Sequence, residues 1–249
     1  MAERMKSKSA GSAGMALRVR DLGLTDYRTV FESMRAFTDQ RDANSTDEIW
    51  LTEHESVFTQ GQAGKPKHVL APADIPVVAT DRGGQVTYHG PGQIVAYTMF
   101  DISRMGIGVR ALVDGLEDAM IAALGIWNIE AEARRDARGV YVRGRKIGAL
   151  GLRVRHGRAY HGLALNVAMD LGHFSRIDPC GLAGMDVTQV SDLGGPADLH
   201  VVREALVRKL ALGFGLDLAA AQPGCWIEGT AQNAFPSPQC CAEQRRETG

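Results

Sequence analysis

Cys180 is the residue of this chain best suited to nucleophilic chemistry. It lies in the motif DPCGL, between Pro179, which restricts the approach of the backbone, and Gly181, which allows a sharp exit. These neighbours predict a loop, where a thiol is accessible, and a nearby cation would populate its thiolate at neutral pH. The alternative is a buried, inert cysteine. The other three cysteines of the chain lack a comparable setting.

Lys146 could supply that cation. It begins the segment KIGALGL, whose other residues are apolar or glycine, and strand alternation puts it on the face of Gly148 and Leu150. An ammonium on such a surface loses solvation, which makes it a tunable proton carrier or charge partner. It could also be a strand-end lysine whose amine reaches solvent. His161, in YHGLALN, is a second candidate base for Cys180, and sequence separation does not decide between the two.

The stretch RGGQVTYHGPGQ has glycines at positions 83, 84, 90 and 92. A strand without side chains lets a ligand lie against bare backbone, and its exposed N–H groups can face a carbonyl oxygen. The stretch is neither a GxGxxG that opens a helix nor a P-loop, so no motif predicts nucleotide binding. Arg82, Tyr88 and His89 are its polar candidates, either for a ligand or for structural hydrogen bonds.

Composition excludes several classes of function. The 249 residues carry a formal net charge of -1 and 45% hydrophobic residues, so no global field favours nucleic acid or a membrane surface. No window approaches the ~18 apolar residues of a membrane span. The seven histidines and four cysteines lack metal-ligand spacing, so we expect no metal site. No secretion signal precedes the first folded segment, which favours a cytoplasmic protein with free thiols.

Basic residues gather around Lys146. Between Arg134 and Arg158 there are nine Lys or Arg residues against one acid, Asp136, in a chain that is nearly neutral overall. Such a run can be an ordinary solvated face. Because Tyr141 is the sole Phe, Tyr or Trp residue between Arg134 and Arg158, base stacking on nucleic acid fits poorly, and we expect an acidic protein partner.

Hydrophobic periodicity predicts the elements that position these residues. Helical spacing marks residues 25–42, 109–125 and a third helix capped by Asp198. Extended segments are predicted at 48–60, 77–80, 86–89 and 94–102, with a type II turn at Pro91-Gly92. Residues 139–167 break at 143–145 and 156–158, which predicts a β-meander. Strands and helices that do not alternate regularly indicate the α+β class.

Five motifs, in this order, resemble the lipoyl(octanoyl) transferases: TQGQAGK, RGGQVTYHGPGQ, GRKIGALGLR, HGLALNV and DPCGL. The match runs from about Leu17 to Trp226. It implies a single catalytic domain, at 15–229. The small, basic and polar residues at 1–14 predict a disordered leader, and the lack of periodicity predicts a flexible tail at 230–249. The implied fold is an α+β domain with a mixed β-sheet flanked by helices, similar to the catalytic domain of lipoate-protein ligases and biotin protein ligases.

The resemblance also implies an activity and its partners. An octanoyl group would pass from octanoyl-acyl carrier protein to one lysine of a lipoyl domain, through a thioester on the enzyme and with no cofactor or ATP. The implied acceptors are the lipoyl domains of 2-oxoacid dehydrogenase complexes and the glycine cleavage H protein. Two other functions stay open: an ATP-dependent lipoate-protein ligase on the same fold, and a non-catalytic module that binds acyl-carrier protein.

The resemblance assigns roles to individual residues. Cys180 would carry the acyl group and Lys146 would lower the pKa of its thiol. Contacts with the acyl substrate are implied for three segments, namely Arg82, Gly83, Gly84, Gln85, Val86, Thr87, Tyr88, His89, Ala149, Leu150, Gly151, Gly162, Leu163 and Ala164. We interpret the glycines as the floor of a tunnel for a linear chain, with Tyr88 and His89 at its reactive end.

Overall fold

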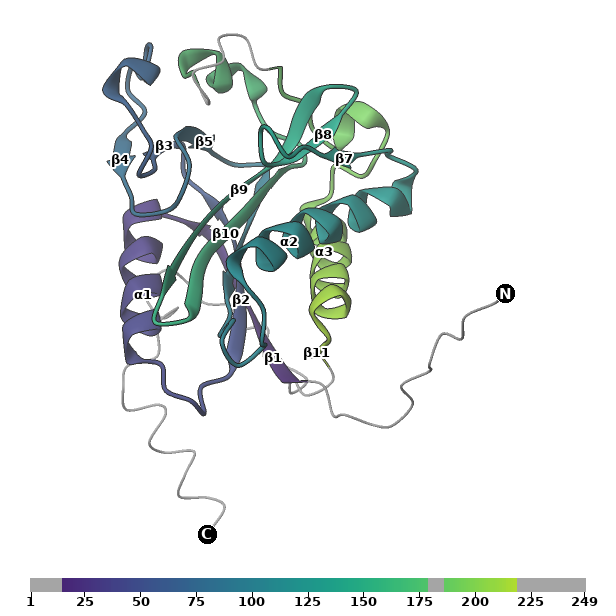
Figure 1. Ribbon diagram of the computed structural model, residues 1–249. Helices are drawn as coiled ribbons and strands as arrows, with labels where there is room; N and C mark the ends of the chain where they lie inside the picture. The colour runs from purple at the N-terminus through teal and green to yellow at the C-terminus, as the bar shows by residue number, and fades with distance from the viewer. Residues whose placement is uncertain (1–14, 179–185, 219–249) are drawn as a thin grey trace.

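An eight-stranded mixed β-sheet forms the centre of the computed structural model, which describes residues 15–178 and 186–218 (Figure 1). The strand order is β11-β1-β2-β6-β10-β9-β8-β7. β1 pairs in parallel with β2 and β11, and the other neighbours pair antiparallel. The strands are β1 (Met15–Thr25), β2 (Asp47–His54), β6 (Gln93–Met99), β7 (Glu132–Ala133), β8 (Val140–Val142), β9 (Arg145–Arg155), β10 (Arg158–Asn166) and β11 (Leu216–Asp217). The predicted leader, the tail and Cys180 lie outside the described residues.

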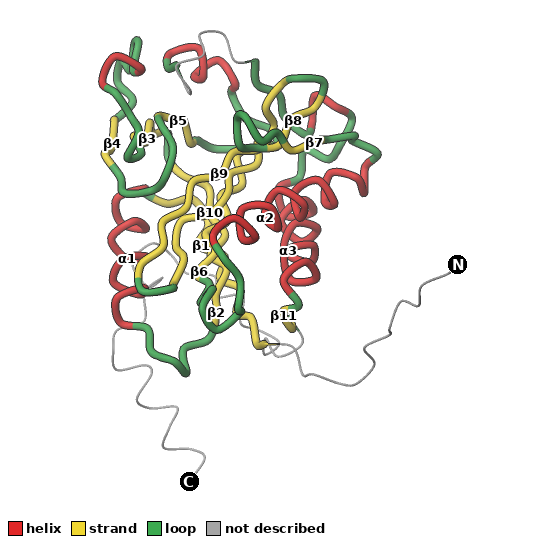
Figure 2. The backbone as a smooth tube through the Cα atoms, viewed as in Figure 1, coloured by secondary structure: helices red, strands yellow, loops and turns green. Residues whose placement is uncertain are grey.

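Three α-helices cover the two faces of this sheet (Figures 1 and 2). On one face α1 (Tyr27–Gln40) places Val30 and Met34 against Trp50 and Tyr97 of the sheet. On the other face α2 (Val109–Leu124) and α3 (Leu199–Phe214) share a second, larger core with the strands. None of the helices in the described ranges is both long and apolar enough to cross a bilayer. The α+β architecture predicted from the sequence is confirmed.

The helix cap and the hairpin turns predicted from local sequence agree with the structure. Asp198 caps α3 by accepting a hydrogen bond from the His200 N–H at 2.8 Å. The β8–β9 and β9–β10 turns occur at Arg143-Gly144 and His156-Gly157, and these four residues have φ between 50° and 77°. Positive φ at both central residues matches the right-handed twist of paired strands. The predicted meander and its two breaks are confirmed.

The turn after the glycine-rich stretch is also confirmed. Gln93 donates its N–H to the Gly90 carbonyl at 3.2 Å, and Gly92 has φ +85°, as a type II turn requires. A Cβ on Gly92 would lie 2.1 Å from the Ala168 carbonyl oxygen. Glycine is therefore needed here both for its φ and for the close approach of a neighbouring backbone.

A second, three-stranded sheet has the order β4-β3-β5. Its strands are β3 (Val57–Gln60), β4 (Val77–Ala79) and β5 (Val86–His89). The 3-10 helices within the described residues are Pro66–His68, Gly125–Trp127, Leu171–Arg176 and Ser191–Leu193. The predicted extended segment 48–60 divides between the two sheets, because β2 pairs with β1 and β6 whereas β3 pairs with β4 and β5. Gly83 donates its N–H to the Leu152 carbonyl at 2.9 Å, which brings the glycine-rich stretch against β9.

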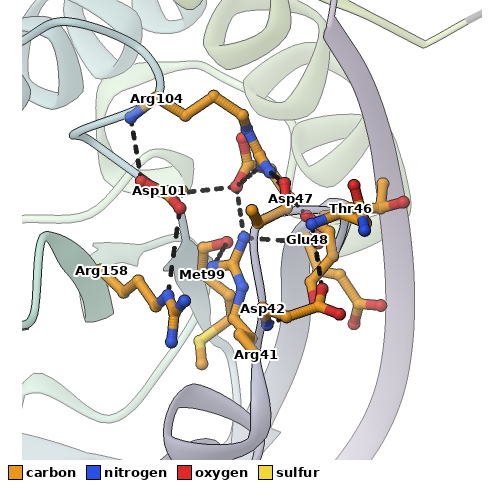
Figure 3. Close-up of polar contacts among 12 residues, drawn as sticks. Arg41, Asp42, Thr46, Asp47, Glu48, Met99, Asp101, Arg104 and Arg158 are labelled. Carbon is orange, nitrogen blue, oxygen red and sulfur yellow. Dashed lines mark hydrogen bonds and ion pairs between the residues drawn. The ribbon is translucent and has the colours of Figure 1, made fainter.

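A buried ionic network joins α1, β2 and β6 at one end of the main sheet (Figure 3). Asp47, fully buried, accepts from the Arg41 guanidinium at 2.5 Å and from the Asp101 N–H at 2.8 Å. Arg104 adds an ion pair to the same oxygen at 2.7 Å, and Arg41 also donates to the Met99 carbonyl at 2.6 Å. The network therefore ties the end of α1 to the ends of two strands.

We expect Asp47→Asn to lower the free energy of unfolding by about 3–5 kcal/mol, because it leaves the buried Arg41 cation without its anion. Urea denaturation at pH 7 measures this loss. Asp39→Asn, which removes the partner of Arg155 in a partly exposed pair at 2.9 Å, should cost less than about 1 kcal/mol. Equal losses in the two variants would contradict a special role for the buried network.

Candidate active site

A cavity of about 510 Å³ lies along β9 and β10 and is bounded by residues of β5 and β6 and by Tyr27 of α1. This volume is typical of a small-molecule site. Three segments far apart in the sequence meet here. The predicted site residues that line the cavity are Arg82, Gly84, Gln85, Val86, Thr87, His89, Lys146, Ala149, Leu150, Gly151, Gly162, Leu163 and Ala164.

Two predicted contact residues, Gly83 and Tyr88, are not part of the cavity wall. The Tyr88 ring is buried against Phe58 and Phe174, and its hydroxyl lies 2.9 Å from the Ser56 hydroxyl. Desolvation raises the pKa of this phenol, so it is neutral at physiological pH. The structure thus places Tyr88 in a neighbouring core, and its contact with a substrate stays a prediction.

Lys146 is half-buried at the start of β9. Its Nζ donates to the Arg138 carbonyl at 3.2 Å and lies 5.2 Å from the centroid of the Tyr141 ring. Its backbone N–H donates to the Asp186 carbonyl, and its own carbonyl accepts from the Thr188 N–H, both at 2.9 Å. Lys146 is thereby attached to the first described residues that follow the segment 179–185.

That segment contains Cys180, which lies outside the described residues. Contact between the Cys180 sulfur and the Lys146 amine therefore stays a prediction. Phe174, six positions before Cys180 in the chain, lines the same cavity as Lys146. Val187, seven positions after it, also lines this cavity and pairs with Lys146. Both flanks of the segment therefore reach the cavity.

His161 lies at a different position along the cavity from Lys146. It stands opposite Leu152 of β9, six residues beyond Lys146, which corresponds to about 20 Å along the strand. Its Nε2–H donates to Asp81 at 2.8 Å. Burial lowers the pKa of His161, and the Asp81 carboxylate only partly opposes this, so the ring is neutral at pH 7. Of the two candidate partners for Cys180, Lys146 is the one whose backbone is hydrogen-bonded to Asp186 and Thr188, just after the segment 179–185.

A group of neutral polar side chains that was not predicted from the sequence lies beside the predicted residues. Tyr27, Gln93, Tyr97 and Asn166 line the cavity. Their signal in the sequence was weak, because Tyr27 fits the apolar spacing of its helix and the other three lie in strands that are otherwise mostly apolar. His89 belongs to this group and donates from Nδ1 to the Gln93 amide oxygen at 2.7 Å. This hydrogen bond joins β5 to β6 in the cavity wall.

Burial keeps two imidazoles of this region uncharged. Desolvation lowers the pKa of His54 to about 4, and its Nε2 lies 2.6 Å from the Tyr97 hydroxyl. Desolvation, followed by the charge of His54, lowers the pKa of His89 to about 3. Their rings lie 5.9 Å apart, and the His89 ring stacks on Tyr27. The cavity wall is therefore polar here without carrying imidazolium charge.

These two pKa values predict how stability depends on pH. In the unfolded chain each imidazole takes up its proton near pH 6.5, whereas in the folded protein His54 does so near 4 and His89 near 3. The folded state therefore loses stability as pH falls from 6.5 toward 4, by about 1.4 kcal/mol per pH unit for each imidazole. Urea denaturation between pH 7 and pH 5 should show that His89→Gln flattens this slope. His156→Gln, in an exposed turn, should leave it unchanged; equal slopes in all three proteins would oppose the assignment.

Arg82 organises the glycine-rich stretch from within. Its buried guanidinium donates to the carbonyls of Thr59, Gly83 and Gln85 at 2.7 to 2.9 Å. Desolvation lowers the pKa of Arg82 from its ordinary value. Arg82 therefore has a structural function in addition to lining the cavity, and its contact with a substrate stays a prediction.

Three glycines of the cavity wall, in β9 and β10, lie close to other protein atoms. A Cβ on Gly162 would lie 2.0 Å from the Ala96 carbonyl oxygen, in the adjacent strand β6. One on Gly151 would lie 2.9 Å from the Gly83 carbonyl oxygen, and one on Gly148 would lie 2.7 Å from the Met120 sulfur. At these three positions an added methyl would meet protein atoms before it narrowed the cavity. A Cβ on Gly84, whose φ is +83°, would meet nothing closer than the Arg82 Nη1 at 3.5 Å, so the tunnel floor expected for the glycine-rich stretch stays a prediction.

We expect Gly162→Ala to destabilise the protein by about 3 kcal/mol, because the new methyl collides with a backbone that cannot rotate away. Gly213→Ala is a matched control, since Gly213 is exposed on α3 with open space around it, and it should stabilise by about 0.5–1 kcal/mol. Thermal unfolding compares the two variants. Similar melting temperatures would show that β10 can move away from β6.

Solved structures place this arrangement in a known fold. The chain superposes on the bipartite lipoate protein ligase of Thermoplasma acidophilum with a TM-score of 0.69 at 17% identity, covering 82% of this chain and 85% of that one. It also matches the Aquifex aeolicus biotin protein ligase in complex with biotin and ATP, with a TM-score of 0.51 at 10% identity, over 80% of this chain and 70% of that one. The fold is therefore that of the lipoate and biotin protein ligases.

Sequence comparison places the chain within this fold. The sequence model of the family described as the lipoyl protein ligase A/B catalytic domain matches residues 26–211 of this chain. An octanoyltransferase of Pseudomonas putida (strain GB-1) is 60% identical over 190 residues, which is 76% of this chain and 88% of the relative. The chain belongs to the lipoyl protein ligase A/B catalytic-domain family, and the resemblance to its octanoyltransferases is confirmed.

Proposed function

We propose that this chain transfers an octanoyl group from octanoyl-acyl carrier protein to a lysine of a lipoyl domain, the first step of protein lipoylation. The observation that carries the proposal is the cavity of about 510 Å³ that begins at Lys146 and continues along β9 and β10. The 60% identity to a protein named octanoyltransferase supports this activity over the other activities of the fold. Cys180 is proposed as the acyl carrier.

The cavity suits an acyl chain that has no headgroup to recognise. Ala149, Leu150, Leu163 and Ala164 supply aliphatic wall, and Val95 adds to it from β6. Burying the methylenes of an octanoyl chain at about 0.8 kcal/mol each contributes several kcal/mol of affinity. Chain binding of this kind requires no nucleotide and no metal.

In the first half-reaction the Cys180 thiolate attacks the carbonyl carbon of the carrier thioester. A new C–S bond forms to Cys180 as the bond to the carrier sulfur breaks. The Lys146 ammonium stabilises the Cys180 thiolate before the attack and gives its proton to the departing carrier thiolate. One thioester replaces another, so this exchange is close to thermoneutral and needs no ATP.

In the second half-reaction the neutral amine of the acceptor lysine attacks the octanoyl-Cys180 thioester. The amide bond forms, Cys180 departs as thiolate, and the amine of Lys146 takes the released proton, which restores the starting state. Because Lys146 changes charge while Cys180 changes bonding, the two groups should titrate as a coupled pair. Amide formation makes the whole sequence downhill.

The basic residues around the cavity fit acidic protein partners. Arg134, Arg135 and Arg143 are exposed, and the loop that carries the first two continues into the cavity wall at Ala137 and Arg138. We propose that carrier protein and lipoyl domains use this surface in turn, in ping-pong order. The acceptors would be the lipoyl domains of 2-oxoacid dehydrogenase complexes and the glycine cleavage H protein, in a cytoplasmic setting.

The deciding experiment is the intact mass of the protein after incubation with octanoyl-acyl carrier protein in the absence of nucleotide. We expect one octanoyl group, which peptide mapping locates on Cys180, and its transfer to an added lipoyl domain. An ATP-dependent ligase would instead require nucleotide and form an acyl-adenylate. A non-catalytic module would bind the carrier protein and gain no mass.

A further inference from the structure

Glu117 is a carboxylate of α2 that is buried beside the main core. It is 1% exposed, and its neighbours Leu116 and Met120 on α2 belong to the main core. A carboxylate in such a place is costly unless it is paired and hydrogen-bonded. Its partners should therefore indicate what it does.

Both Glu117 oxygens are used by one loop, residues 136–139. Oε1 accepts from the Gly139 N–H at 2.8 Å, and Oε2 accepts from the Arg138 guanidinium at 2.8 Å. Asp114, one helical turn earlier, also accepts from Arg138, at 2.7 Å, but its side chain is 50% exposed. Glu117 thus holds the backbone and side chain of this loop from within the core, whereas Asp114 touches only the guanidinium.

The same loop contacts Lys146. The Arg138 carbonyl accepts from Lys146 Nζ at 3.2 Å, and a Cβ on Gly139, whose φ is +138°, would lie 2.9 Å from Lys146 Cε. The Tyr141 hydroxyl donates to the Ala137 carbonyl at 2.7 Å, and the Tyr141 ring lies beside the ammonium. A small shift of the loop would therefore move both the acceptor and the steric wall around Lys146.

Glu117 itself is not part of the cavity wall, so it acts through the loop and does not touch an acyl chain. Among the residues that the structure describes, the charged side chains that line the cavity near Lys146 are Asp136 and Arg138. Of these, Arg138 is the one paired with Glu117, at 2.8 Å.

We propose that Glu117 is a positioning residue: by fixing the 136–139 loop against α2, it fixes the carbonyl that receives the Lys146 ammonium and keeps Nζ in place for acyl transfer. The catalytic part of this inference rests on the proposed function. The part that concerns the position of the Lys146 amine does not rest on the proposed function, and that position can be tested without any acyl substrate.

The test is the labelling rate of Lys146 in Glu117→Gln. The amide keeps the size of the carboxylate and can still accept from the Gly139 N–H, but it cannot pair with the Arg138 cation. Limiting acetic anhydride modifies lysine amines, and peptide mass spectrometry reports Lys146 alone. We expect labelling about tenfold faster than in the wild type, because the released amine becomes accessible, and a kcat about tenfold lower with an unchanged KM for octanoyl-acyl carrier protein.

Two variants separate positioning from general destabilisation. Asp114→Asn removes the outer contact to Arg138 and should change labelling less than about twofold. Leu116→Ala removes core volume from the same helix and should lower the melting temperature without changing the labelling rate. Should Glu117→Gln fold poorly, Arg138→Met breaks the same contact from a side chain that is 34% exposed, and should also speed labelling.

Labelling of Lys146 at the wild-type rate in Glu117→Gln, or in Arg138→Met where the first variant fails to fold, overturns the inference. An unchanged kcat in a variant with faster labelling overturns its catalytic part. A wild-type protein that gains no octanoyl group contradicts the proposed function, and the labelling rates still decide whether Glu117 positions the amine.

Discussion

Cys180→Ser should abolish the octanoyl-enzyme and lower octanoyl transfer by about 10⁴-fold or more, the loss typical of removing a nucleophile. The reason is the difference in acidity between the two groups. A free thiol has a pKa of about 8.5, so one nearby ammonium is enough to populate the thiolate at neutral pH. A serine hydroxyl stays protonated in the same setting, and a lysine that works as a cation cannot ionise it.

Intact mass after incubation with octanoyl-acyl carrier protein measures the loss directly. Cys225→Ser is the matched control, because it removes a thiol that lies in none of the family motifs, and it should acquire the octanoyl group at the wild-type rate. A full octanoyl adduct on Cys180→Ser at the wild-type rate would remove Cys180 from the mechanism and move the search to another nucleophile.

Lys146→Ala should lower kcat by about 10²- to 10⁴-fold, the range of a general acid–base contribution. It should also move the midpoint of Cys180 alkylation against pH upward, toward the value of an ordinary thiol. The structure gives the reason for expecting both effects. The Lys146 amine lies on the cavity wall, and its backbone is bonded to Asp186 and Thr188, just beyond the segment that contains Cys180.

Lys146→Arg separates the two roles of this lysine. A guanidinium keeps the positive charge but does not give up its proton, so the alkylation midpoint should stay near that of the wild type while transfer to the acceptor fails. Lys67→Ala, at an exposed lysine, controls for the loss of surface charge. An unchanged alkylation curve in Lys146→Ala would remove the lysine from activation of the thiol.

Local structure followed from the sequence because local interactions decide it. The helical spacing after Thr25, the cap at Asp198 and the turns at Arg143-Gly144 and His156-Gly157 depend on residues within one or two turns of each other. The family motifs added the cavity wall, since RGGQVTYH, GALG and HGLA were expected to lie together. Most of the residues named from them line the cavity, with Gly83 and Tyr88 as the exceptions.

Tertiary structure decided what depends on contacts between distant segments. Periodicity assigned no element to residues 15–24, yet they form the strand β1, whose Arg20 is buried in a bidentate pair with Glu48 of β2. From the sequence alone a charged residue is expected to be exposed to solvent, because the strand that supplies its buried partner is not known.

The same reason explains why the roles of Glu117 and Gly162 were not predicted from the sequence. Nothing in the neighbourhood of Glu117 in the sequence indicates the loop that it holds, which begins about twenty residues later. The need for glycine at position 162 comes from the Ala96 carbonyl in another strand. The sequence by itself determined most of the elements, the motifs and the family of this chain. Only the tertiary structure determined which buried groups hold those motifs in place, because desolvation and steric exclusion act between segments that the chain brings together when it folds.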